Sequence, residues 1–228
     1  MSTFRGGIKP TMKIAGVILA GGKSSRYGKP KMFETYKGKC FYEHSVDALK
    51  AHSLSPIVIV TNDDLFPSFK RNDVEFIIEH DTNAYQGPLF AMYQALSSIA
   101  DADWFFVLSC DIPFVHSAFV EYMIRLTKDS EYDAIVPVQA DQIHPLLALY
   151  HRRSLVTMKQ LVDRNERKIR LFLDQIRVQT IPFSNEDSVF ININHREDWL
   201  TYKQASQQTQ EAHNEQSLTQ RTEIFYKK

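Results

Sequence analysis

Short apolar runs alternate along the chain with stretches that have the periodicity of amphipathic helices. The first four runs are continuously apolar, which indicates strands buried on both faces; they span residues 13–20, 56–62, 75–79 and 103–111. Helical spacing of apolar residues occurs over residues 41–51, 89–100 and 116–126. This alternation predicts an α/β fold around a mainly parallel sheet.

Four further strand-like runs lie in the second half of the chain, over residues 133–139, 144–151, 178–183 and 189–194. The first two are joined by the short link "ADQI". A link of this length fits a hairpin better than a helical crossover. This hairpin would add an antiparallel pair of strands, so the predicted sheet is mainly parallel but can be mixed.

The composition changes near residue 203. From there to the C-terminus the chain is rich in Gln, Glu and Thr and poor in aliphatic residues, which indicates a helix that frays outward or a disordered tail. With 228 residues and 43% hydrophobic content, the chain can form one substantial core. We predict an N-terminal extension over residues 1–12, one domain over 13–202 and a polar helix or tail over 203–228.

The charge balance, the absence of long apolar segments and the cysteine content bear on which partners and which compartment we expect. Lys plus Arg and Asp plus Glu balance at 27 each, so no overall field attracts nucleic acid or an anionic membrane, and an anion site must be local. No segment approaches the roughly 18 apolar residues of a membrane span. Cys40 and Cys110 lack metal-ligand spacing and fit a reduced compartment. We expect a cytoplasmic protein that binds neither nucleic acid nor membrane.

The segment "GVILAGGKSSRYGKPKM", residues 16–32, follows the first run and has the composition of an anion-binding loop. It fails the dinucleotide pattern G-x-G-x-x-G because Gly21 and Gly22 are adjacent. It fails the pattern G-x-x-x-x-G-K-[ST] because five residues separate Gly22 from Gly28, and Pro30 stands where a hydroxyl is needed. The segment is therefore not a P-loop of the NTPase type.

The same loop still contains the parts of a phosphate cradle. Its small residues, whose backbone N–H groups can approach a ligand closely, are Ala20, Gly21 and Gly22. Its hydroxyl and cationic side chains are Ser24, Ser25, Arg26 and Lys31. Ligands of open α/β sheets bind beyond the carboxyl ends of the strands, where this loop begins. The alternative is an ordinary Gly-rich turn with solvated cations; the two cations in one loop favour an anion site.

The stretch "LAGGKSSRYGKPK" closely resembles the signature L-A-G-G-x-S-x-R-[MFY]-G-x-x-K of the molybdenum cofactor guanylyltransferases, within the nucleotidyltransferase superfamily. The resemblance extends from about residue 13 to residue 199 and implies a three-layer α/β/α Rossmann-like fold. It implies that Leu19, Ala20, Gly21 and Gly22 bind the nucleotide, with the backbone around Leu19 and Gly21 meeting guanine. Cytidylyltransferase relatives commonly read L-A-A-G, so Gly21 favours guanylyl transfer.

The resemblance implies catalytic roles for Arg26 and Lys31, the cations of the loop, and for Asp111. Arg26 and Lys31 would meet phosphates. Asp111 follows an apolar run in "FFVLSCDIP", where a carboxylate at the end of a buried strand can face the same crevice. On its own such an Asp serves equally well as a helix N-cap or turn residue. Its segment resembles the family's C-D-x-P, whose Asp binds the metal and the nucleotide, so we expect Asp111 to bind Mg²⁺.

One further segment matches the family with departures. In "DTNAYQGPLFAMYQAL" the pair Gly87 and Pro88 matches the family's G-P-L-A-G, whereas Phe90 and Ala91 replace its Ala and second Gly. An Asp that contacts the nucleotide precedes this segment in the family, and Asp81 is the best candidate, although gapless counting reaches His80.

The resemblance also implies residues that contact the pterin substrate, in two segments near the C-terminal end of the matched region. His144 lies in "DQIHPLLALYH" and matches a His-Pro segment, although a turn histidine without a role is an equal interpretation. Asn192 and Asn194 match F-x-N-[VI]-N in "VFININHREDW". Strand alternation would place both asparagines on one face, where they would need polar partners. They could instead cap the following helix.

The implied reaction is attack by the terminal phosphate of molybdopterin on the α-phosphorus of GTP, which releases pyrophosphate. A phosphomonoester has a second pKa near ~6, so the nucleophile is already ionised at neutral pH and needs no general base. The expected enzyme is a Mg²⁺-dependent guanylyltransferase whose partners are GTP, molybdopterin and proteins that deliver or accept the cofactor. The alternatives are CMP or sugar-1-phosphate nucleotidyl transfer, and a noncatalytic nucleotide-binding protein.

Overall fold

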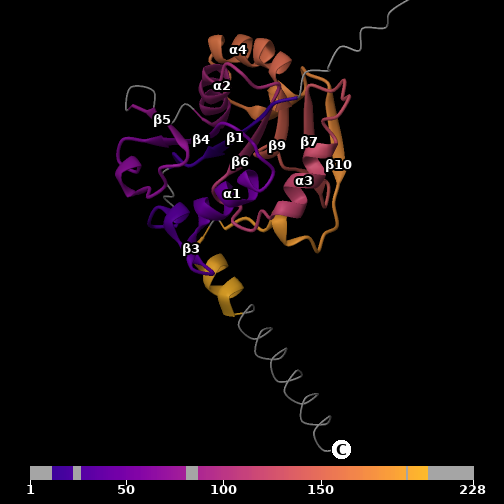
Figure 1. Ribbon diagram of the computed structural model, residues 1–228. Helices are drawn as coiled ribbons and strands as arrows, with labels where there is room; N and C mark the ends of the chain where they lie inside the picture. The colour runs from indigo at the N-terminus through magenta and orange to yellow at the C-terminus, as the bar shows by residue number, and fades with distance from the viewer. Residues whose placement is uncertain (1–11, 23–26, 81–86, 194, 205–228) are drawn as a thin grey trace, which may run out of the picture. The chain divides into compact units, whose positions relative to one another are not determined.

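Residues 12–22, 27–80, 87–193 and 195–204 are described by a computed structural model of the chain (Figure 1). They belong to two units. The first contains the described residues up to 22 together with 30–192, and the second contains 27–29 with the described residues from 193 onward. The second unit includes a helical stretch over residues 196–204. The domain limits expected at residues 13 and 202 stay predictions.

A central sheet with the strand order β10-β7-β9-β6-β1-β4-β5 forms the middle layer of the first unit. Its strands are β1 (Ile14–Leu19), β4 (Ile57–Asn62), β5 (Glu75–Glu79), β6 (Trp104–Ser109), β7 (Ala134–Gln139), β9 (Leu147–His151) and β10 (Val178–Pro182), with β8 (Gln142–Ile143) paired to β7. Strands β2 (Thr35–Tyr36) and β3 (Lys39–Cys40) form a separate pair.

Most neighbouring strands of the sheet are parallel, as predicted. The pairs β1–β4, β1–β6, β4–β5 and β7–β10 are parallel, whereas β9 runs antiparallel to both β6 and β7. Strand β8 pairs antiparallel with the end of β7, so the "ADQI" link does form a tight hairpin. The expectation of a mainly parallel, mixed sheet is confirmed.

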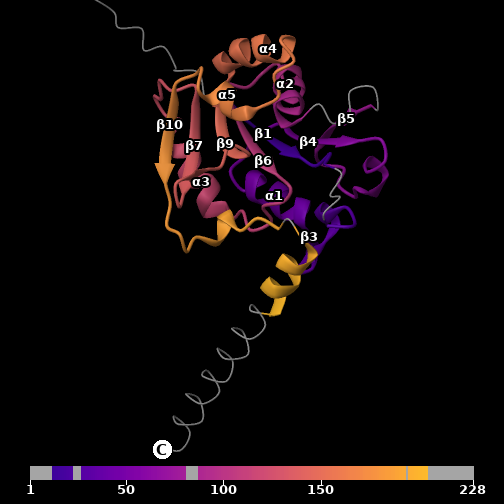
Figure 2. The ribbon, with the colours of Figure 1, turned by 180° about the vertical axis from the view of Figure 1, so that it is seen from behind.

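Helices cover both faces of the sheet (Figures 1 and 2). They are α1 (Phe41–Lys50) and α3 (Ser117–Arg125) on one face, and α2 (Pro88–Ser98), α4 (Leu155–Asp163) and α5 (Ile169–Leu173) on the other. Successive strand residues alternate between two apolar clusters: Ile18 packs on the side of α1 and α3, and Val17 on the side of α2 and α4. This burial on both faces is why the strands read as continuous apolar runs.

The structure differs from the prediction over residues 189–193, which contain no strand. Ser188–Phe190 form a short 3-10 helix, and residues 191–193 have no regular structure. The Asp187 carboxylate accepts a hydrogen bond of 3.0 Å from the Val189 N–H and caps this turn. Val189 and Phe190 are both buried within this turn.

Several short elements were not predicted from the sequence. They are α4, α5, the β2–β3 pair and the 3-10 helices at Lys31–Phe33, Phe66–Ser68 and Arg152–Ser154. Among the helices of the described residues, none combines the length and the apolar character needed to cross a bilayer.

Replacement of Leu149 should test how strongly the central strands stabilise the fold. Leu149 is fully buried in β9 and lies opposite Phe106 of β6 and Ile135 of β7. Leu149→Ala should lower the unfolding free energy by about 2–5 kcal/mol, because the lost side chain leaves a cavity. Val156→Ala on α4, where Val156 is 65% exposed, is the control and should change it by less than about 0.5 kcal/mol. Equal effects in denaturant unfolding would contradict this account.

Candidate active site

The carboxyl ends of β1 and β6 bring two distant parts of the sequence together. The strands pair in parallel with Leu19 opposite Ser109. Beyond the ladder the Cys110 N–H donates to the Leu19 carbonyl at 3.1 Å, and the Ala20 N–H donates to Val60 of β4 at 2.8 Å. The residue after Cys110 therefore emerges beside the start of the predicted nucleotide loop.

Asp111 is that residue, and it forms an ion pair with Lys31. The Lys31 Nζ lies 3.1 Å from the Asp111 Oδ2. The other carboxylate oxygen, Oδ1, accepts a short hydrogen bond from the Ser109 hydroxyl. The two side chains keep 12% and 22% of their surfaces exposed. Two predicted site residues 80 positions apart thus meet at the edge of the sheet, within reach of solvent.

The carboxylate of Asp111 can hold a cation together with a phosphate ligand. Among the described residues, no group of three or more His, Cys, Asp or Glu side chains is arranged to hold a metal ion. Mg²⁺ is commonly bound through one or two carboxylates plus substrate phosphates and water, so a lone Asp111 fits that chemistry. Neighbouring Cys110 is buried, which, helped by the charge of Asp111, raises the pKa of its thiol to about 12. The Cys110 thiol is therefore protonated at neutral pH.

Asn62 holds the backbone of the loop that follows β1. Its side-chain Nδ2 donates to the Gly21 carbonyl at 3.1 Å, and its Oδ1 accepts from the Leu65 N–H at 3.0 Å. The Thr61 hydroxyl reaches the Ala20 carbonyl at 3.4 Å. These contacts orient the peptide groups of the loop. Sequence reasoning missed Asn62, although the polar end of the otherwise apolar run "IVIVTN" is a usable signal.

The glycines of this loop have different environments. A Cβ on Gly22 would meet nothing within 4 Å, so backbone at this position is open to a ligand. A Cβ on Gly21 would come within 2.9 Å of the Glu79 Oε2 at the end of β5. Gly21 therefore permits a close approach of Glu79 to the loop. Glu79 was also missed, since a charged residue at the end of a short run looks like solvated surface.

Helix α2 begins at Pro88, and Gly87 is its N-cap residue. Gly87 has φ of 93° and ψ of 166°, a backbone conformation that only glycine adopts without strain. Pro88 takes the first helical position, which suits its fixed φ. The Ala91 N–H donates to the Gly87 carbonyl at 3.3 Å, so Ala91 continues the helix in place of the family's glycine.

His144 lies close to the end of β6, whereas Asn192 does not sit on the predicted strand. The Leu146 carbonyl, two residues after His144, accepts a 2.8 Å bond from the Ser109 N–H. The His144 Nε2 is buried and has no hydrogen-bond partner in the described part of the chain. Burial lowers the pKa of His144, so its ring is neutral at pH 7. Its ring centroid is 4.7 Å from that of Phe190.

The prediction that Asn192 and Asn194 lie on one face of a strand is not supported for Asn192. Asn192 is exposed within the irregular residues 191–193, so alternation along a strand cannot place it. Asn194, Arg26 and Asp81 lie outside the described residues. His80, the alternative to Asp81, is exposed and has its Nδ1 3.0 Å from the Asp63 carboxylate.

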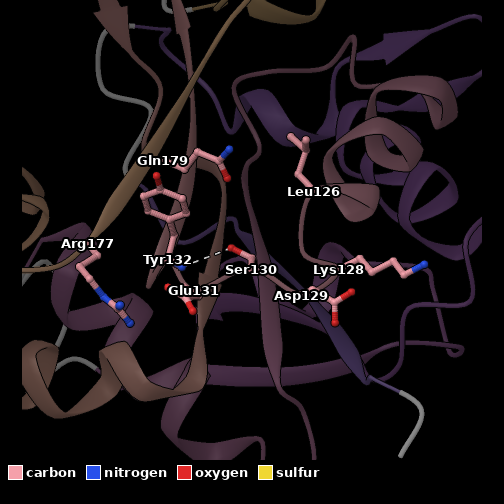
Figure 3. A pocket seen from close by; sticks show the side chains of 8 residues that line it. All are labelled: Leu126, Lys128, Asp129, Ser130, Glu131, Tyr132, Arg177 and Gln179. Atoms are coloured by element: carbon pink, nitrogen blue, oxygen red, sulfur yellow. Dashed lines mark hydrogen bonds between the residues drawn. The ribbon is translucent and has the colours of Figure 1, made fainter. Parts of the chain in front are cut away.

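A separate hollow lies where strands β7 and β10 begin, away from the carboxyl ends of the parallel strands. It has a volume of about 510 Å³, and Figure 3 shows the residues that line it: Leu126, Lys128, Asp129, Ser130, Glu131, Tyr132, Arg177 and Gln179. None of the predicted site residues is among them. The candidate active site is therefore at the edge that contains Lys31 and Asp111.

Comparison with known proteins identifies relatives over most of the chain. Residues 16–180 match the family model described as a MobA-like NTP transferase domain. A probable molybdenum cofactor guanylyltransferase of Halalkalibacterium halodurans is 34% identical over 189 residues, which cover 80% of this chain and 94% of the relative. A protein of the same description from a Geobacillus strain is 31% identical over 186 residues, with the same coverage of both chains.

Solved structures share the fold. The molybdopterin-guanine dinucleotide biosynthesis protein A of Archaeoglobus fulgidus has a TM-score of 0.67 and 25% identity, and covers 86% of this chain and 100% of its own. CMP:2-keto-3-deoxy-manno-octonic acid synthetase complexed with CTP has a TM-score of 0.69 with 16% identity, over 86% and 99% of the two chains; at that identity the likeness concerns the fold alone. The predicted nucleotidyltransferase fold is confirmed.

Gly87→Ala should destabilise the protein, because Ala is strained at the observed φ of 93°. We expect a loss of about 1–3 kcal/mol in unfolding free energy. Gly22→Ala is the matched control, since its added methyl group would meet nothing within 4 Å, and it should change stability by less than about 0.5 kcal/mol. Thermal and denaturant unfolding measure both. A Gly87→Ala variant as stable as the wild type would show that this backbone conformation is not required.

Proposed function

The chain belongs to the MobA-like NTP transferase family, and on that premise we propose that it transfers GMP from GTP to the terminal phosphate of molybdenum-molybdopterin. The products are the guanine dinucleotide form of the cofactor and pyrophosphate. The observation that carries the proposal is the ion pair of Lys31 and Asp111 beside the Gly-rich loop after β1. A cation for phosphate and a carboxylate for a metal stand together where nucleotides bind in open α/β sheets.

Lys31 is proposed to bind the phosphates of GTP. In the structure its ammonium group faces Asp111 at 3.1 Å, and a triphosphate with its own metal would offer it more negative charge. Arg26 would share this role, as the family motif implies. Both cations would stabilise the charge that develops on the pyrophosphate leaving group. Catalysis then consists mainly of positioning and electrostatic stabilisation.

Asp111 is the residue proposed to hold Mg²⁺. The ion, when bound with the triphosphate, neutralises charge on the oxygens around the reacting phosphorus. The hydrogen bond from Ser109 to Oδ1 orients the carboxylate and leaves Oδ2, now facing Lys31, to turn toward the cation.

The attacking group needs no protein base. A phosphomonoester with a second pKa near ~6 is ionised at neutral pH. His144 is proposed to donate a hydrogen bond to the pterin substrate, because its buried Nε2 has no partner among the described residues and nearby Leu146 accepts a hydrogen bond from Ser109 at the end of β6. Asn192 and Asn194 are proposed for the same side of the site on the basis of the motif. Proteins that deliver or accept the cofactor are proposed as partners.

A cytoplasmic setting is part of the proposal. Both cysteines, Cys40 and Cys110, are free in the structure, which suits a compartment that keeps thiols reduced.

Asp111→Asn should abolish most of the transfer activity while the fold is retained. The amide preserves the shape and the acceptor for Ser109 but removes the charge, so we expect kcat to fall by about 10²–10³-fold. The assay follows pyrophosphate release from GTP and molybdenum-molybdopterin as Mg²⁺ is titrated. Asp163→Asn, at the exposed end of α4, is the control and should behave as the wild type. Wild-type turnover and Mg²⁺ dependence in Asp111→Asn would refute the metal assignment.

Nucleotide selectivity should distinguish guanylyl transfer from related chemistries. GTP with Mg²⁺ should raise the melting temperature more than ATP, CTP or UTP. A ligand that binds only the folded state stabilises it by about 2.7 kcal/mol at 100 times its dissociation constant. A preference for CTP or UTP would contradict the proposal and favour another nucleotidyl transfer. No shift with any nucleotide would point to a protein that does not bind NTP.

A further inference from the structure

Glu79 ends strand β5 and lies against the loop that follows β1. Its partner in the parallel ladder is Asn62, whose side chain holds the Gly21 carbonyl. The Glu79 Oε2 is 2.9 Å from the point where a Cβ would stand on Gly21. A side chain at position 21 would displace this carboxylate from its present place, so Glu79 lies directly against the loop at Gly21.

The Glu79 carboxylate is half-buried, and none of the described residues gives it a hydrogen bond or an ion pair. Burial raises the pKa of this carboxyl group, as expected where no donor stabilises the charge. The comparison with Asp111 is informative, because both oxygens of Asp111 have protein partners. A ligand seated on the loop would displace water from Glu79 and would have to supply hydrogen-bond donors in its place.

The position of Glu79 suits the base of a nucleotide and not its phosphates. In the strand order β6-β1-β4-β5, Asp111 follows β6 and Glu79 ends β5. Three strand spacings separate them, or roughly 14 Å. A carboxylate would repel phosphate groups, so the phosphates belong at the end with Lys31. An extended nucleotide lying across the carboxyl ends of these strands then places its base near Glu79.

Guanine is the base whose edge matches an unpaired carboxylate. It presents two adjacent donors, the N1–H and the 2-amino group, to the two oxygens of one carboxylate. Adenine and cytosine present a ring-nitrogen acceptor at the corresponding place, and uracil has a single N–H between two carbonyl groups. A carboxylate can therefore accept two hydrogen bonds from guanine. With adenine or cytosine, the carboxylate would face a ring nitrogen that is also an acceptor, which is unfavourable.

We propose that Glu79 is the specificity-determining residue for guanine, accepting hydrogen bonds from its N1–H and 2-amino groups. The inference rests on the proposed function and deepens it by assigning a side chain to base selection. Gly21 acts through Glu79, because its lack of a side chain allows the carboxylate to lie beside the loop. The hydrogen bonds of Asn62 keep the Gly21 peptide in the orientation that leaves this space.

Inosine triphosphate provides the test, because it differs from GTP only in lacking the 2-amino group. The full-length wild-type protein with Mg²⁺ should bind GTP about 10–100-fold more tightly than ITP by calorimetry, which corresponds to a hydrogen bond to a charged group. In Glu79→Ala the ratio should fall to within about 3-fold, through weaker binding of GTP. Glu79→Gln, which retains one acceptor, should give an intermediate ratio.

Glu75→Gln is the matched control for these variants. Glu75 starts the same strand and is exposed, so its replacement should leave the GTP-to-ITP ratio at the wild-type value. Melting temperatures of the nucleotide-free variants should match the wild type, because Glu79 makes no hydrogen bond or ion pair within the described chain that its loss would break.

The outcomes separate the two proposals. If the wild type prefers GTP over the other triphosphates but the Glu79 variants keep its GTP-to-ITP ratio, the assignment of Glu79 is overturned and the proposed function stands. Equal binding of GTP and ITP by the wild type also overturns the assignment. If the wild type shows no preference for GTP over CTP, UTP and ATP, both proposals fail together.

Discussion

Parallel hydrogen bonding between β1 and β6 carries both strands to the same edge of the sheet and continues one step beyond the ladder, from the Cys110 N–H to the Leu19 carbonyl. That last bond places Asp111 beside the loop after β1. Lys31, which begins the 3-10 helix after that loop, then meets Asp111 at 3.1 Å. Both faces of these strands are buried, and a slip by one residue would send each apolar side chain to the opposite cluster.

The charges of the site are local, in a protein whose Lys plus Arg and Asp plus Glu residues balance at 27 each. Lys31 and Asp111 neutralise each other in the structure, so neither is left as an isolated charge at the edge of the sheet. Binding of a metal and a triphosphate would exchange one favourable charge pair for several. Such a site holds its charges in place before the ligand arrives, which is the condition for electrostatic stabilisation without large reorganisation.

Glu79 and Asp111 show how one sheet edge can bind chemically different parts of a ligand. Asp111 has two protein partners, one of which is the cation Lys31, and this suits a role among phosphates and metal. Glu79 has no such partner in the described chain and lies against the backbone of Gly21. Its carboxylate is therefore suited to accept hydrogen bonds from neutral N–H groups of a ligand. The strand order keeps the two residues three strands apart, so in the proposed arrangement the carboxylate of Glu79 would stand away from the phosphates.

The sequence by itself determined the class of fold, most strand and helix positions, and the family, because continuous apolar runs and a dense loop motif are local patterns. It predicted Lys31 and Asp111 as parts of one site, although their roles stay predictions. Tertiary structure alone decided that residues 189–193 form no strand, because Ser188–Phe190 form a 3-10 helix that Asp187 caps. It also revealed Asn62 and Glu79, because their significance comes from contact with Gly21, and a contact across strands leaves no periodic signal in the chain.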